Sequence, residues 1–342
     1  MKVPKARKIN DTTWFIQLRL NGVSIPVTGE TEAECTNKAI LIKAKHKTGE
    51  KKVQKKKKDL TLSEVVDNYI DKYENVLSPS TICGYATIRR NRFPDYMDKS
   101  VLKIKDWQRM INKELETKSE HTVKNAWGLV SAALKDSGYD VPSVKLAEVP
   151  IKEMPFLDTD EIEKFLKAAK GDDCELEMLL ELHGLRKSEV MAVIKNNQFD
   201  LKHNTIIVSG AIVPDRNFKR VEKATNKNKT STRTIPIMIP RLKVLLKEYE
   251  KQKKTPTLHS SSTMSRHVHN VCKAAGITDT SNHGLRHTFA SLCYSQGLSE
   301  RATMELGGWS NPDTMHRIYI RLSQRDKKKA QNAVADFFKN IK

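Results

Sequence analysis

The stretch from His283 to Tyr319 constrains this chain more than any other, because it gathers side chains suited to an attack on phosphate. It contains His-Gly-Leu-Arg-His at 283–287, Leu-Gly-Gly-Trp at 306–309 and Tyr-Ile-Arg at 319–321. His283 and Arg286 are three residues apart, so a helix would place them one turn apart on the same face. We expect the rest of the chain to be organised around this stretch.

Each of these side chains has a chemical use at a phosphodiester. The planar, permanently charged guanidinium of Arg286 can hold two phosphate oxygens at once. His283 can donate to the phosphate or take a proton from a nucleophile. Trp309 offers apolar packing and one N–H donor. Tyr319 can act as a nucleophile if a base or clustered positive charge activates its phenol, whose ordinary pKa is ~10. The predicted product is a phosphotyrosine ester.

A second arginine motif supplies a further cation. The segment His-Gly-Leu-Arg-Lys-Ser-Glu at 183–189 follows an apolar helical run that includes Leu176, Leu179 and Leu180. Gly184 interrupts this run, which places Arg186 at the turn into another helix.

Four motifs together resemble the tyrosine recombinase (phage integrase) family, in particular integrases of phages and conjugative transposons that carry an arm-binding domain. They are Gly-Leu-Arg-Lys-Ser-Glu at 184–189, the 283–287 motif, Leu-Gly-Gly-Trp-Ser-Asn at 306–311 and the 319–321 motif, in family order and at similar spacing. The resemblance implies a site-specific recombinase that integrates and excises a mobile element.

The resemblance also implies roles for individual residues. Arg186 and Arg286 would neutralise the non-bridging oxygens, Tyr319 would form a 3′-phosphotyrosyl link, and Glu189 would orient the site. The departing strand would keep a free 5′-hydroxyl. Trp309 stands where most family members carry His, which puts proton transfer from that position in doubt. Because the ester conserves bond energy, the reaction would need no metal, ATP or other cofactor.

By the same resemblance, a hairpin lysine protonates the leaving 5′ oxygen. The candidates lie in a basic loop at 223–233 between short strands expected near 205–208 and 233–237. Lys227 precedes Pro236 at a spacing that resembles relatives with a longer hairpin, and Lys229 would need a tighter turn. A solvated hairpin tip is the alternative interpretation of this loop.

Each assignment has a simpler alternative. Taken alone, Arg186 could be a surface arginine paired with Glu189, and Trp309 and Tyr319 could be core aromatics. The shared order of the motifs favours a site. Two other functions use a similar fold, namely a DNA-binding protein without chemistry and a type IB topoisomerase-like relaxer. The complete catalytic set argues against the first, and a separate N-terminal module favours recombination over the second.

Composition points to the same class of partner. The 342 residues carry a net charge of +20, which favours a polyanion, and nucleic acid is the leading candidate. Five cysteines without C-x-x-C spacing indicate neither a disulfide framework nor a zinc site. Neither a membrane-spanning run nor a signal peptide is evident, so we expect a soluble cytoplasmic protein.

The predicted fold is multidomain and mainly α. We expect an arm-type DNA-binding domain at 1–50 (three-stranded sheet plus helix), a Lys-rich linker at 51–59, a helical, SAM-like core-binding domain at 60–141, a linker at 142–155, and a mixed α+β, mostly helical catalytic domain at 156–342. The prediction of the first two folded domains rests on an Asn-Gly hairpin signal at 21–22 and on capping boxes at 31–34 and 61–64.

The expected partner is double-stranded DNA at core and arm attachment sites. Lys55, Lys56 and Lys57 could neutralise phosphates, and the cluster of Arg89, Arg90 and Arg92 resembles the DNA-facing side of the core-binding domain. The resemblance further implies a homotetramer on DNA, whose tail helix at 321–342 packs on a neighbouring protomer. An excisionase or a host DNA-bending protein is a possible additional partner.

Overall fold

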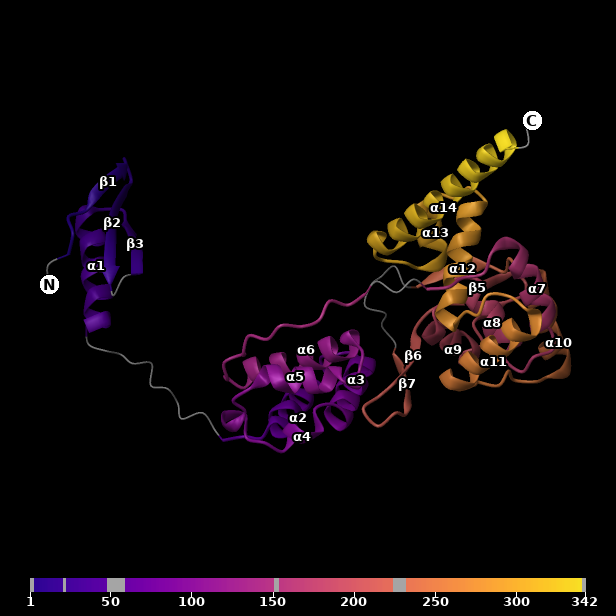
Figure 1. The fold of residues 1–342 in the computed structure, drawn as a ribbon, viewed down its shortest axis with the longest axis horizontal. Helices are drawn as coiled ribbons and strands as arrows, with labels where there is room; N and C mark the ends of the chain where they lie inside the picture. The colour runs from indigo at the N-terminus through magenta and orange to yellow at the C-terminus, as the bar shows by residue number, and fades with distance from the viewer. Residues whose placement is uncertain (1–2, 21–22, 48–58, 151–153, 224–231, 340–342) are drawn as a thin grey trace.

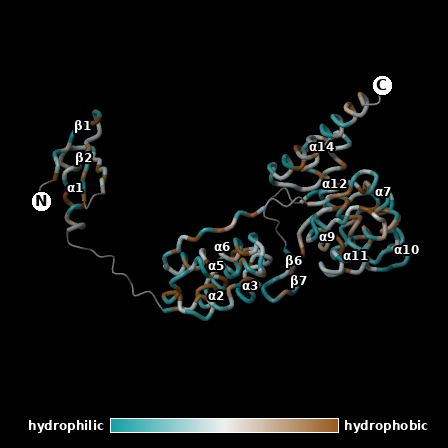
Figure 2. Tube along the Cα trace, in the orientation of Figure 1, coloured by the Kyte–Doolittle hydropathy of each residue, from teal (hydrophilic) through white to brown (hydrophobic). Residues whose placement is uncertain are grey.

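The computed structural model describes residues 3–20, 23–47, 59–150, 154–223 and 232–339. They form three folded parts, which are mainly helical with small antiparallel sheets, as the sequence predicts (Figure 1). Hydrophobic residues occur within each part, and each has its own buried cluster (Figure 2).

The N-terminal part is a three-stranded sheet with one helix. Strands β1 (Arg7–Asn10), β2 (Thr13–Leu20) and β3 (Val23–Gly29) pair in the order β1-β2-β3. Leu20 pairs with Val23, so β2 and β3 form the hairpin expected at Asn-Gly, although those two residues lie outside the described part. Helix α1 (Glu32–Lys47) follows, and Cys35 and Ala39 on it pack against the sheet.

The second part is entirely helical. It contains α2 (Leu62–Tyr73), α3 (Pro79–Asn91), α4 (Pro94–Met97), the 3-10 helix η1 (Val101–Lys103), α5 (Trp107–Leu115) and α6 (Glu120–Asp136). Helix α2 begins at the predicted capping box, in which Thr61 accepts the Glu64 N–H and the Glu64 carboxylate accepts the Thr61 N–H. Residues 142–150, where a linker is expected, contain neither helix nor strand.

The third part holds the predicted motifs. Its elements are α7 (Thr159–Ala169), α8 (Glu175–Glu181), α9 (Lys187–Lys195), β4 (Phe199–Asp200), β5 (Thr205–Val208), β8 (Arg233–Pro236), α10 (Pro240–Gln252), α11 (Ser261–Ala275), α12 (Asn282–Ser295), α13 (Glu300–Gly307) and α14 (Pro312–Lys339). Strands β4, β5 and β8 form an antiparallel sheet in that order, and Ile206 faces Ile235 in its buried layer.

A hairpin that the sequence did not predict lies between β5 and the basic loop. Its strands are β6 (Ala211–Pro214) and β7 (Arg220–Lys223). Arg216 in its turn pairs with Asp71 of the helical part, with 2.5 Å between Nη1 and Oδ1. The guanidinium of Arg90 stacks on the Phe218 ring. Each strand has only four residues and β6 ends in a proline, so its pattern was too short to identify.

The C-terminal segment is one long helix. The tail expected from residue 321 is the continuation of α14, which also carries Tyr319. Val334 and Phe338 are exposed on it. In the part of the chain that the structure covers, no helix is long and apolar enough to cross a membrane.

Gly184 shapes the connection that presents Arg186. It has φ +83° between α8 and α9, and a Cβ added there would lie 2.6 Å from Cδ1 of Phe289. Gly171 offers a comparison in the same part of the chain, because its φ is +84° but nothing lies within 4 Å of an added Cβ.

We predict that Gly184→Ala destabilises the protein more than Gly171→Ala. The left-handed conformation alone should cost about 1 kcal/mol in both variants, and overpacking against Phe289 should cost Gly184→Ala about 2 kcal/mol more. Urea unfolding of the two variants measures the difference. Equal free energies of unfolding would show that Phe289 yields without cost.

Candidate active site

Arg186 is fixed from both sides at the start of α9. Its backbone N–H donates to Oε2 of Glu189 at 2.9 Å, and its Nη1 donates to Oε1 of the same carboxylate at 2.7 Å. Its Nη2 donates to the Gly308 carbonyl at 2.7 Å. The side chain is still about one-third exposed (36%), so a ligand can reach it. The predicted turn into a second helix is confirmed.

Arg286 is almost completely buried on α12, with 1% of its surface exposed. Its Nη1 donates to the carbonyls of Gly184 and Gly307, and its guanidinium lies 3.8 Å from the centre of the Trp309 ring. Its Nε and Nη2 have no hydrogen-bond partner among the described residues. Because an unpaired buried donor costs roughly 1–3 kcal/mol, these two N–H groups are suited to an anionic ligand.

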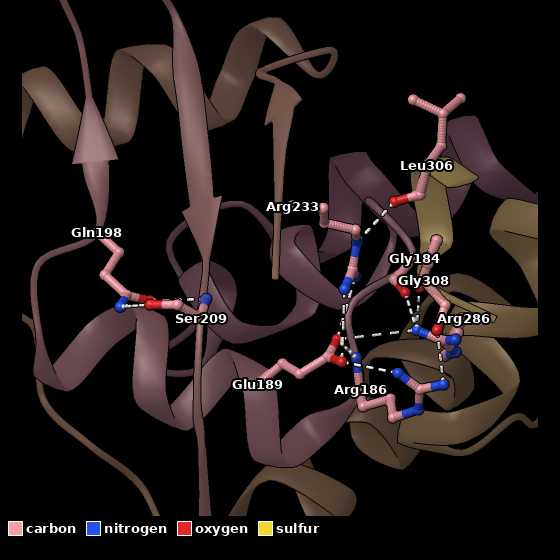
Figure 3. A network of polar contacts seen from close by, with 10 residues as sticks. Gly184, Arg186, Glu189, Gln198, Ser209, Arg233, Arg286, Leu306 and Gly308 are labelled. Carbon is pink, nitrogen blue, oxygen red and sulfur yellow. Dashed lines mark hydrogen bonds and ion pairs between the residues drawn. The ribbon is translucent and has the colours of Figure 1, made fainter. Parts of the chain in front are cut away.

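Glu189 is the anion that joins the arginines, as Figure 3 shows. Only 3% of its side chain is exposed, and it contacts Arg186, Arg233 at 3.1 Å and Arg286 at 3.9 Å. Burial raises the pKa of this carboxyl, but the guanidinium groups of Arg233, Arg186 and Arg286 outweigh burial and hold the pKa below its ordinary value. Three cations therefore surround one ionised carboxylate.

The turn that ends α13 completes this cluster. Three consecutive carbonyls each accept from one arginine: Leu306 from Arg233, Gly307 from Arg286 and Gly308 from Arg186. The C-terminal end of a helix carries partial negative charge, which favours these cations. Gly308 has φ +69° and leads directly into Trp309, so the turn also places the indole beside Arg286.

His283 lies on α12 one turn before Arg286, as predicted, and part of its ring remains exposed. Its pKa lies below the ordinary value, because the ring is partly desolvated and faces the cations Arg286, Arg186 and Lys187. The imidazole is therefore neutral near pH 7 and can accept a proton.

Tyr319 is buried on α14 in the same hydrophobic cluster as Trp309. Its hydroxyl lies 2.6 Å from Oγ1 of Thr303 and donates to the Leu298 carbonyl at 3.0 Å. Burial raises the pKa of the phenol, and the hydrogen bond with Thr303 opposes this rise. Among the described residues no hydrogen bond joins Tyr319 to Arg186, Arg286 or His283. The structure thus brings the arginines and Trp309 together and holds the phenol apart.

The remaining predicted site residues are five lysines and three arginines. Lys227 and Lys229, like Lys55, Lys56 and Lys57, lie outside the described residues. Arg89 pairs with Asp67 at 3.0 Å, and Arg92 pairs with buried Glu114 at 3.1 Å. Together with the stacking of Arg90 on Phe218, these contacts orient the three arginines within the protein.

Two groups of side chains are close enough to hold a metal ion. They are Asp172, Cys174 and His267, and Cys174, Glu177 and His259. In each group the histidine Nδ1 already contacts the carboxylate, at 2.8 Å from Asp172 and 2.6 Å from Glu177. Each histidine thus has a hydrogen-bond partner without an ion.

Several residues of the site escaped the sequence analysis. Arg233 was noted only as the end of the basic loop, and Thr303 was not singled out. Glu181 of α8 was also missed, although its Oε2 accepts from Asn282 at the start of α12. No local motif marks these residues, because each acts on a partner that is distant in the sequence.

Glu181 ties α8 to the helix that carries His283 and Arg286. It is completely buried, and its Oε1 has no partner in the described part of the chain. Burial raises the pKa of this carboxyl to about 8. The folded protein therefore keeps Glu181 protonated at pH 7, whereas the unfolded chain would ionise it.

We predict that Glu181→Gln makes the protein less sensitive to rising pH. A folded-state pKa above the unfolded one gives stability that is fully present below pH ~4.5 and is lost as pH rises toward 8, by up to about 5 kcal/mol. The variant lacks this loss, so its stability relative to wild type should increase from pH 5 to pH 8. Urea unfolding at pH 5 and pH 8 measures the difference in free energy of unfolding between the variant and wild type.

Glu163→Gln is the matched control, since Glu163 is exposed beside Lys167 and should stay ionised in both states over this range. Its difference from wild type should not change with pH. A Glu181→Gln variant that shows the wild-type pH dependence would contradict the assignment.

The model of the phage integrase family matches residues 155–326, slightly more than half of the chain. A tyrosine recombinase XerC-like protein from Caldanaerobacter subterraneus subsp. tengcongensis is 24% identical over 334 residues, which cover 82% of this chain and 84% of the relative.

Two solved structures share the fold. The Tn1549 transposon integrase in complex with a circular intermediate DNA has a TM-score of 0.62 at 17% identity, covering 79% of this chain and 99% of that one. A lambda integrase dimer bound to a core site has a TM-score of 0.57 at 18% identity, covering 92% and 94%. At these identities the likeness establishes the fold alone.

Proposed function

We propose, from the premise that this chain belongs to the phage integrase family, that it integrates and excises a mobile DNA element by site-specific recombination. Family membership makes the chain a tyrosine recombinase, an enzyme that breaks and rejoins DNA strands. The observation that best supports the proposed chemistry is the buried Arg286, whose Nε and Nη2 have no hydrogen-bond partner among the described residues and whose guanidinium shares the cationic cluster with Arg186.

The proposed reaction is a transesterification at phosphorus. Arg186 and Arg286 neutralise the non-bridging oxygens, and the Tyr319 oxygen attacks the phosphorus as its proton passes to neutral His283. The bond to the 5′ oxygen breaks, and Lys227 supplies the proton to that oxygen. A 3′-phosphotyrosyl link and a 5′-hydroxyl result, and a 5′-hydroxyl of the same or a partner duplex reverses the step.

This reaction requires Tyr319 to leave its present partners. The hydrogen bonds to Thr303 and Leu298 must break before the phenol reaches a phosphate held by the arginines. A net neutral hydrogen bond is worth only about 1 kcal/mol, so DNA contacts can offset the loss. We infer that α14 moves when the enzyme assembles on DNA as a homotetramer.

The three folded parts take separate roles in this proposal. Residues 1–50 read arm sites, and the helical and catalytic parts close around the core site. The net charge of +20 supports a large phosphate contact area. Arg7 and Lys8 are exposed on the edge strand β1, where they can meet a DNA backbone. An excisionase or a DNA-bending protein would assist on arm-site DNA.

We predict that Tyr319→Phe binds core-site DNA with unchanged affinity but forms no covalent adduct. The substitution removes only the attacking oxygen, and the aromatic ring keeps its place in the hydrophobic cluster. A suicide duplex nicked near the cleavage site traps the wild-type adduct, which a denaturing gel resolves.

Tyr294→Phe is the matched control, because its ring packs edge-on against Tyr319 at 5.1 Å between centres. It should retain adduct formation. Adduct in the Tyr319 variant, or its loss in the Tyr294 variant alone, would show that another residue attacks.

We further predict that removal of residues 1–58 spares cleavage of core-type DNA but abolishes integration that depends on arm sites. The catalytic side chains all lie beyond this segment, and the lost lysines should make the salt dependence of DNA binding shallower. Binding measured on both DNA types over a range of salt concentrations tests this. A truncated protein that still distinguishes arm-site DNA would refute the domain proposal.

A further inference from the structure

Arg233 is the third arginine of the cluster and comes from a different element than the other two. It is the first residue of β8, and only 8% of its side chain is exposed. Its Nη2 lies 3.1 Å from Oε2 of Glu189, and its Nε donates to the Leu306 carbonyl at 2.9 Å. Figure 3 shows Arg233 above the Glu189 carboxylate and Arg186 to its lower right.

Charge explains why the site needs a third arginine. Glu189 orients Arg186, since its two oxygens accept hydrogen bonds from the backbone N–H and the guanidinium of Arg186. The same carboxylate cancels one positive charge close to the place where phosphate must bind. With Arg233 the cluster keeps a net charge of two, and without it the net charge falls to one.

The place of Arg233 at the turn that ends α13 is a second reason why the site needs it. Arg233 bonds the first of the three carbonyls that end α13, and its guanidinium lies where a side chain on Gly308 would otherwise stand. The following carbonyls bond Arg286 and Arg186. Arg233 therefore fixes the turn against which both other arginines are aligned.

We propose that Arg233 is a positioning residue of the phosphate site: it offsets Glu189 and anchors the 306–308 turn, so that Arg186 and Arg286 present two uncompensated charges to one scissile phosphate. Arg233 acts through Glu189 and this turn, and not by direct contact with the phosphate. This inference rests on the proposed transesterification and adds a residue to its machinery.

The test measures single-turnover cleavage at saturating suicide duplex. Arg233→Met, which keeps the length of the side chain and removes its charge, should slow adduct formation about 100-fold, the loss typical for one preorganised charge partner. Arg233→Lys restores the charge without the two-pronged geometry and should recover about tenfold of that loss. DNA affinity should change less than about threefold, because binding draws on the whole basic surface.

Two further experiments distinguish the effect of the Arg233 charge from its structural support of the 306–308 turn. A duplex with methylphosphonate at the scissile position carries no charge there, so on it Arg233→Met should be within about fivefold of wild type. On the ordinary duplex, Arg233→Met combined with Glu189→Gln returns the net charge to two, and the amide oxygen of the substituted side chain can still accept one of the two Arg186 hydrogen bonds. This double variant should cleave about tenfold faster than Arg233→Met alone.

Arg241→Met is the matched control for loss of a buried pair. Arg241 bonds buried Glu175 through Nε at 2.6 Å and Nη2 at 2.9 Å, and among the described residues it makes no hydrogen bond or ion pair with the arginine cluster. It should lose thermal stability as Arg233→Met does and cleave at the wild-type rate.

Several results would overturn the inference. These are an equal loss on charged and neutral phosphate, no gain in the double variant, or an Arg233→Met rate within threefold of wild type. The proposed function fails separately if wild-type protein forms no adduct with the ordinary duplex, and the inference then fails with it.

Discussion

The site depends on one ionic cluster, in which a buried carboxylate and the end of a helix hold three guanidinium groups. Glu189 and the 306–308 carbonyls supply the acceptors, and Arg186, Arg233 and Arg286 supply the charge. Breaking such a buried pair usually costs several kcal/mol because the remaining charge is stranded. The cluster joins α9, β8, α12 and α13, so the same contacts that assemble the third folded part also give the candidate site its positive charge.

The arginine cluster is already assembled, but the proposed nucleophile is not in place. Tyr319 keeps its hydroxyl on Thr303 and Leu298, in an apolar setting that raises its pKa. A phenol in this position is a poor nucleophile. The cationic cluster would lower the pKa of a phenol brought beside it, so movement of Tyr319 would both position and activate the group. The proposal therefore links cleavage to assembly on DNA, where contacts that favour a shifted α14 would become available.

The sequence predicted the local features of this arrangement well. Gly184 and the Glu189 carboxylate define the turn at Arg186 through contacts within a few residues, and helical spacing places His283 beside Arg286. Arg233 could not be found in this way, since its partner Glu189 is 44 residues away and the pairing of β8 decides where the side chain lies. The position of the Tyr319 hydroxyl could not be predicted from the sequence either, because its contact with Thr303 depends on how α13 packs against α14. The β6–β7 hairpin was missed because its strands are too short for a clear pattern.

We propose that this buried cationic cluster serves a covalent attack by Tyr319. The most direct measurement is tandem mass spectrometry of the proteolytic peptide that stays linked to DNA after reaction of wild-type protein with a suicide duplex. We expect a nucleotide attached through a 3′-phosphodiester to the Tyr319 oxygen. A nucleotide on any other residue, or linkage through a 5′-phosphate, would contradict it.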